Sequence, residues 1–73
     1  MNLKEIKIFE VLPGTTIDEA ISEGLDIARR DQVYVRFKFN GVQLQMSPRD
    51  AEEAVKNYYY QCLNRLRKGM GTN

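Results

Sequence analysis

The sequence contains no histidine and a single cysteine, Cys62, among its 73 residues. Histidine is the side chain that most often serves as a general base or a metal ligand near neutral pH, so its absence disfavours most acid–base and metal-dependent catalysis. One cysteine cannot form an internal disulfide, which is typical of proteins kept in a reducing compartment. We therefore expect a cytoplasmic protein that is not an enzyme and holds neither cofactor nor metal.

Long apolar runs are also missing, since no stretch of the sequence is long enough to span a bilayer. The first residues lack the charged-then-apolar order of a secretory signal, and no glycine-rich phosphate loop or small-molecule site is evident. The net charge is +1, so no overall field favours nucleic acid or an anionic membrane. The length suits one domain, and we expect residues 1–73 to form it, with a frayed tail at 69–73.

The clearest pattern is a β-hairpin between Val33 and Met46. Apolar and polar residues alternate on both sides of Asn40-Gly41, a pair that tolerates the positive φ angles of a two-residue turn. This turn predicts that Phe39 pairs with Val42, Phe37 with Leu44, and Val35 with Met46. A slip of one residue would place phenylalanine opposite glutamine, so the register is strongly specified.

A strand and a helix are predicted before the hairpin. Residues 4–12 alternate apolar and charged side chains, with a change of phase near Phe9 that predicts a bulge, and Pro13-Gly14 ends the strand. Thr16 and Glu19 then form a capping box for a helix over residues 17–30. The apolar stripe of this helix recurs with helical spacing at Ile17, Ala20, Ile21, Gly24, Leu25 and Ala28.

A second helix is predicted after the hairpin, with Ser47 as its N-cap, Pro48 in its first turn and an end near Lys68. Tyr60 is expected to point outward and Tyr59 to lie at the edge of the buried stripe. That stripe is predicted to contain Ala51, Ala54, Val55, Tyr58, Cys62 and Leu66.

These elements predict an α+β fold with the order β-α-β-β-α. We expect a three-stranded mixed or antiparallel sheet with both helices packed on one face. The split β-α-β arrangement, with strand order 1-3-2, is favoured; in the alternative, 3-2-1, strands 1 and 2 run parallel. The layout of a capped helix, a Phe-Asn-Gly turn and a Ser-Pro-capped helix resembles compact accessory proteins, including those that small phage genomes carry.

The second helix predicts a binding surface, because about 21 residues of helix are longer than a strand of seven and extend past the sheet. Apolar residues beyond the edge of a core favour a partner, either a second copy in a homodimer or another protein, as in an adaptor or inhibitor. The expected partner-binding residues are Tyr59, Tyr60, Leu63, Leu66, Arg65 and Arg67. An exposed edge of the sheet is a second expected docking position, by strand addition.

Nucleic-acid binding is the alternative, because the net charge is −4 over residues 1–27 and +5 over residues 28–73. The residues expected to carry it are Tyr34, Arg36, Lys38 and Lys68. Two observations disfavour it. Cations are ordinarily placed at helix C-termini, and the outer sheet face offers one aromatic side chain where RNA-binding sheets use two or three.

Overall fold

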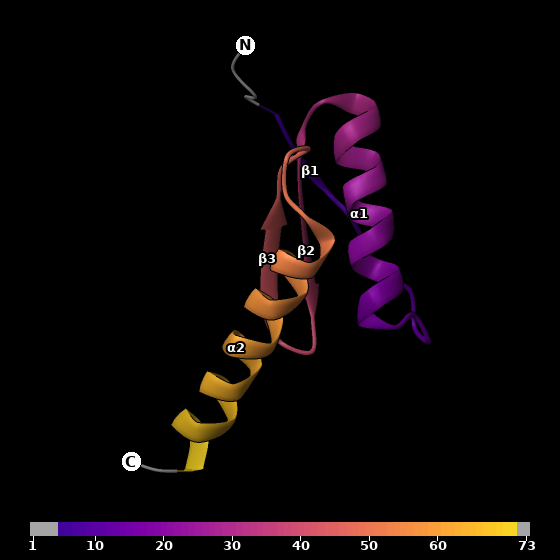
Figure 1. Ribbon diagram of the computed structural model, residues 1–73. Helices are drawn as coiled ribbons and strands as arrows, with labels where there is room; N and C mark the ends of the chain where they lie inside the picture. Colours follow the sequence, from indigo (N-terminus) through magenta and orange to yellow (C-terminus); the bar gives the residue numbers. More distant parts are fainter. Residues whose placement is uncertain (1–4, 72–73) are drawn as a thin grey trace.

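The structure of the protein is a computed structural model that describes residues 5–71 (Figure 1). Its elements are β1 (Ile6–Ile8), α1 (Ile17–Asp31), β2 (Tyr34–Phe39), β3 (Val42–Met46) and α2 (Glu52–Gly71). One mixed sheet and two helices in the order β-α-β-β-α confirm the predicted α+β class.

The hairpin has the predicted register. β2 and β3 pair antiparallel, with Phe39 opposite Val42 and Phe37 opposite Leu44. Asn40 and Gly41 have φ angles of 51° and 80°, the positive values that a type I′ turn needs. The inward-facing residues of both strands are buried except Phe39, which is half-buried.

The strand order is β1-β2-β3, with β1 parallel to β2, so the favoured 1-3-2 order is wrong. The alternation of apolar and polar residues could not distinguish the two strand orders, because each strand buries one face against the core in both. β2 is the longest strand and occupies the centre, where it is bonded on both sides. β3 is consequently an edge of the sheet.

The first strand is shorter than predicted, and its apolar residues lie on the outer face of the sheet. It ends at Ile8, and Ile6 and Ile8 are 43% and 69% exposed on the outer face, in register with Tyr34 and Arg36 of β2. The chain leaves the strand at Phe9, whose ring packs edge-on against Phe37 at 5.7 Å between centroids. The predicted change of phase near Phe9 is therefore the end of the strand, where the chain turns toward the core.

α1 follows the sequence prediction closely. The Thr16 hydroxyl accepts a hydrogen bond from the Glu19 amide, and the Glu19 carboxylate accepts one from the Thr16 amide. The predicted stripe is buried apart from Ile17, which is half-buried. Gly24 lies against the sheet: a Cβ there would come within 3.0 Å of Met46 Sδ and 3.4 Å of Phe37 Cε2.

α2 buries a different stripe from the predicted one. Tyr59 is 2% exposed and belongs to the core with Val55, whereas Tyr58 is 55% exposed. Cys62 and Leu63 are half-buried against the same core. The predicted stripe was centred too far toward Tyr58, because tyrosines at consecutive positions let the apolar pattern fit either phase.

α2 also begins later than predicted. The Ser47 amide donates a hydrogen bond to Asp50 Oδ2 at 2.8 Å, but residues 47–50 form a turn outside the helix. The Arg29 side chain donates to the backbone oxygens of Pro48 and Asp50, which a helix starting at Pro48 would need for itself. The helix then runs through Gly69 to Gly71, since glycine weakens a helix by about 1 kcal/mol without ending it. The rest of the predicted tail, residues 72 and 73, lies outside the described residues.

Candidate functional site

The outer edge of β3 carries backbone groups that the sheet does not use. Arg36, which lies opposite Gln45, accepts a hydrogen bond of 2.8 Å at its carbonyl oxygen from the Phe9 amide, on the β1 side. In an antiparallel ladder, residues opposite each other either bond each other or both point away. Gln45, and by the same alternation Gln43, therefore direct their amide and carbonyl groups toward the open edge. Within residues 5–71, β3 pairs with β2 alone.

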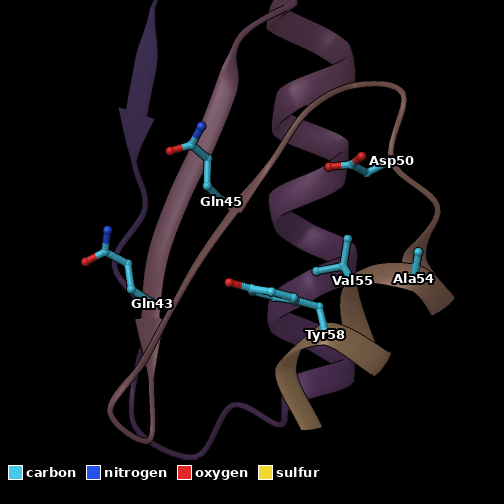
Figure 2. A pocket seen from close by; sticks show the side chains of 6 residues that line it. All are labelled: Gln43, Gln45, Asp50, Ala54, Val55 and Tyr58. Carbon is cyan, nitrogen blue, oxygen red and sulfur yellow. The ribbon is translucent and has the colours of Figure 1, made fainter. Parts of the chain in front are cut away.

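A groove lies along this edge, between β3 and the start of α2. It has a volume of about 320 Å³. Figure 2 shows Tyr58 reaching from the helix toward the strand, with Asp50 in the preceding loop. The lining residues are Gln43, Gln45, Asp50, Ala54, Val55 and Tyr58. Because the lining combines outward-facing strand residues with residues of the helix, the groove follows the edge of β3 rather than one face of the sheet.

A second hollow continues the groove toward the hairpin turn. It has a volume of about 290 Å³, and its lining includes Gln43, which also lines the first groove. The other lining residues are Gly41, Val42, Cys62, Arg65 and Leu66. We call the two hollows together the β3 groove. It runs from Asp50 at one end to Arg65 and Leu66 at the other.

Tyr58 is the main aromatic side chain of the β3 groove. The neighbouring Cys62 thiol raises the pKa of the phenol above its ordinary value of 10.0, and the positive charge of Arg65 opposes that rise. The phenol is therefore uncharged at neutral pH. It presents an apolar ring and a hydroxyl group to anything that occupies the groove.

The charges at the two ends of the β3 groove differ. Asp50 accepts a hydrogen bond from the Ser47 amide, so its carboxylate already has a partner. Among the described residues, no carboxylate lies within 4.0 Å of the Arg65 guanidinium. The groove is therefore open to an anionic group at the end beside Arg65.

The predicted partner-binding residues separate into three groups. Tyr59 is buried in the core and Leu63 is half-buried against it, so neither presents its apolar side chain fully to a partner. Arg65 and Leu66 line the β3 groove. Tyr60 is 47% exposed; like the exposed Arg67, it lines neither hollow of the groove. Figure 1 shows that α2 does continue past the hairpin turn.

Three of the four predicted nucleic-acid-binding residues lie on the outer face of the sheet. Tyr34, Arg36 and Lys38 alternate along β2, so they share its outer face. The Arg36 guanidinium donates two hydrogen bonds to Gln45 Oε1, at 2.9 and 3.3 Å. Arg36 and Lys38 also line a hollow of about 560 Å³ beside the end of β1. Lys68 belongs to α2, but its side chain lies outside the described part.

Sequence reasoning missed most of the β3 groove. Gln43, Gln45, Ala54 and Tyr58 were assigned to a solvated strand face and a buried helix stripe, because the sequence does not show that the sheet ends at β3. A signal was nevertheless present. Val42 to Met46 contains neither a charged residue nor a proline, the residues with which proteins usually protect an edge strand.

In the described range 5–71, no three histidine, cysteine or carboxylate side chains come together as a metal site would require. Neither helix, over its described residues, combines the length and the apolar character needed to cross a membrane. No protein-family model, no curated protein and no solved structure matches this chain.

Proposed function

We propose that this protein is a non-enzymatic protein-binding module, an adaptor or inhibitor, that takes up an extended segment of another protein as a fourth strand beside β3. Both helices cover the inner face of the sheet in this proposal, and the segment lies in the β3 groove beneath α2. The open amide and carbonyl groups of Gln43 and Gln45 supply its backbone hydrogen bonds, as in other cases of strand addition.

The observation that carries the proposal is an exposed part of α2 beside the open edge of β3. Ala54 and Tyr58 lie four residues apart, so they share one side of the helix. Both are exposed and both line the β3 groove, beside the strand at which the sheet of the described residues ends. A fourth strand would place its inward side chains against this part of the helix, which explains why the sequence makes it apolar.

The shape of the edge favours a bare segment over a second copy of this chain. Pairing β3 with β3 of a second copy sets the two strands about 4.8 Å apart. Each copy would bring its own α2, which packs on β3 and lines its edge. Packed helices need about 8–10 Å between their axes, so the two α2 helices would collide. An extended segment without a helix avoids that collision.

The test is affinity capture from a lysate of the source organism, using the tagged wild-type chain and two variants. Ala54→Arg fills the β3 groove from an exposed helix position. Asn57→Arg makes a similar change of charge and size at an exposed position of the same helix that lines neither hollow. We expect the wild type and Asn57→Arg to capture a partner protein that stays bound after nuclease treatment. Ala54→Arg should not capture it.

Gln43→Pro provides a second variant that acts on the backbone. It removes an outward amide that the fold does not use, whereas Gln43→Ala keeps that amide. Partner binding should fall with proline and survive with alanine, while circular dichroism shows both variants folded. Capture that is equal with Ala54→Arg and Asn57→Arg contradicts the proposal. Capture that disappears on nuclease treatment instead favours nucleic-acid binding through Tyr34, Arg36 and Lys38.

Self-association through the far part of α2 is a second candidate. Tyr60 and Leu66 are 47% and 42% exposed there. Tyr60 is the better probe because Leu66 also lines the β3 groove. A homodimer built on this surface should sediment as a dimer and become a monomer with Tyr60→Asp. A monomeric wild type at high concentration excludes it.

A further inference from the structure

We infer that the segment bound in the β3 groove is acidic at the end that lies beside Arg65 and apolar where it passes under Ala54 and Tyr58. This inference rests on the proposed function and adds the chemistry of the partner. It is carried by the register of the open edge and by the distribution of charge along it.

The register assigns each side chain of the added strand to a surface. In an antiparallel added strand, the residues that bond to the open groups of Gln43 and Gln45 lie opposite them, and their side chains point to the same outer face. The residue between them, opposite Leu44, points inward. It meets Ala54, Val55 and Tyr58, the helix residues that line the groove. The small apolar side chains of Ala54 and Val55 and the ring of Tyr58 favour an apolar side chain at that position.

The next inward residue, opposite Val42, enters the second hollow. That hollow is lined by Cys62, Arg65 and Leu66 from the helix. Arg65 has no carboxylate partner among the described residues, and partial enclosure by the added strand would strengthen its attraction for an anion. A carboxylate here can form a two-point hydrogen-bonded pair with the guanidinium.

The outer face adds to the positive charge at the same end. Lys38 is the cross-strand neighbour of Gln43, and no carboxylate in the described part lies within 4.0 Å of its ammonium group. At the opposite end, Asp50 is the acidic lining residue, and its carboxylate is held by the Ser47 amide. A segment with acidic residues toward the hairpin turn therefore fits the charges of the groove, whereas one with basic residues there meets Arg65 and Lys38.

A displayed library of short random peptides, selected on the wild-type chain, tests this inference. We expect enriched peptides to alternate apolar and polar residues and to share an aspartate or glutamate at one end. A synthetic representative should bind Arg65→Glu about tenfold or more weakly, because two like charges are then brought together. Replacing the acidic residue of the peptide with lysine should restore binding to Arg65→Glu.

Arg67→Glu is the matched control. It makes the same change of charge two residues further along, about 200° around the helix and outside the groove. Affinity should stay within about twofold of the wild type, apart from the general effect of salt. The inference is overturned if the selected peptides lack an acidic end and bind Arg65→Glu as tightly as the wild type. The proposed function still stands in that case if Ala54→Arg abolishes their binding.

Two other outcomes are informative. Peptides that bind Ala54→Arg as well as the wild type overturn both the inference and the proposed function. A wild-type dimer that Ala54→Arg dissociates, seen by sedimentation without any peptide, shows that a second copy occupies the groove and overturns the inference. Ala54→Arg and Arg65→Glu both replace exposed helix residues, so we expect each variant to fold. A cooperative thermal unfolding transition verifies this.

Discussion

The Asn40 side-chain amide donates a hydrogen bond to the Tyr59 hydroxyl at 3.0 Å, which ties the hairpin turn to the buried face of α2. The Tyr59 ring also packs edge-on against Phe39, the residue before the turn, at 5.8 Å between centroids. The two contacts fix the rotation of α2 about its axis. By directing Tyr59 inward they leave Tyr58 beside the open edge of β3, where the groove forms.

Tyr59→Phe tests this link. Asn40 loses its acceptor while the ring stays in the core, so the free energy of unfolding should fall by about 0.5–1 kcal/mol. Tyr59→Ala removes the ring and should cost about 3–5 kcal/mol, enough to unfold a domain this small. Urea denaturation followed by circular dichroism measures both changes.

Tyr58 and Tyr60 provide the controls for that measurement. Both are exposed, so Tyr58→Phe and Tyr60→Phe should change the free energy of unfolding by no more than about 0.5 kcal/mol. If Tyr58→Ala proves more destabilising than Tyr59→Ala, the helix is rotated as the sequence pattern had suggested, and the β3 groove does not exist in this form.

Gly24 tests the contact between α1 and the sheet. Gly24→Ala should shift stability by no more than about 1 kcal/mol, because the gain in helix propensity offsets a tight contact with Met46. Gly24→Val adds two more carbons toward Met46 and Phe37, and should destabilise the fold by about 2–3 kcal/mol. Ser22→Val, at an exposed position of the same helix, is the control and should cost much less.

The parts of the fold that were predictable from the sequence are those that local chemistry decides. Asn40-Gly41 specifies its own turn type, and the alternation on either side then specifies the register of the hairpin. Thr16 and Glu19 cap α1 through contacts within one turn. The stripe of α1 has apolar residues on one face only, so a single rotation of that helix buries them.

The parts that were not predictable depend on contacts between distant residues. The start of α2 is set by Arg29 of α1, which occupies two backbone oxygens of the preceding turn. The rotation of α2 is set by Asn40, because consecutive tyrosines leave the pattern ambiguous. The strand order depends on which edge of β2 receives β1. The β3 groove follows from these last two features together, which is why it was not predicted.

Lys7 and Asp31 form an ion pair of 2.7 Å between β1 and the end of α1. The hydrogen bond from Lys7 lowers the pKa of the Asp31 carboxyl below its ordinary value of 3.8. The contribution of this pair to stability is therefore complete above the pKa of the unfolded chain and is lost as the pH falls through the folded pKa. Lys7→Gln should melt below the wild type at pH 7, and the difference in Tm should vanish in acid.

Lys38→Gln is the control for this pH dependence, since Lys38 has no ion pair among the described residues. Its Tm relative to the wild type should not change as Asp31 is protonated. High salt should reduce the effect of Lys7→Gln at pH 7, because the pair is exposed to solvent. A difference in Tm that persists at low pH would mean that Lys7 contributes by packing rather than by charge.

Amide hydrogen exchange reads the open edge of β3 directly. The amides of Val42, Leu44 and Met46 bond to β2, whereas those of Gln43 and Gln45 point away from it. If the bonded amides exchange only when the domain unfolds, a stability of about 3–5 kcal/mol protects them by about 100-fold or more. Gln43 and Gln45 should exchange near the rate of an unstructured chain, an alternation that NMR resolves residue by residue.

A peptide bound in the β3 groove should protect these two amides selectively. Protection of both in the free protein would instead show that the edge is already paired before any peptide is added.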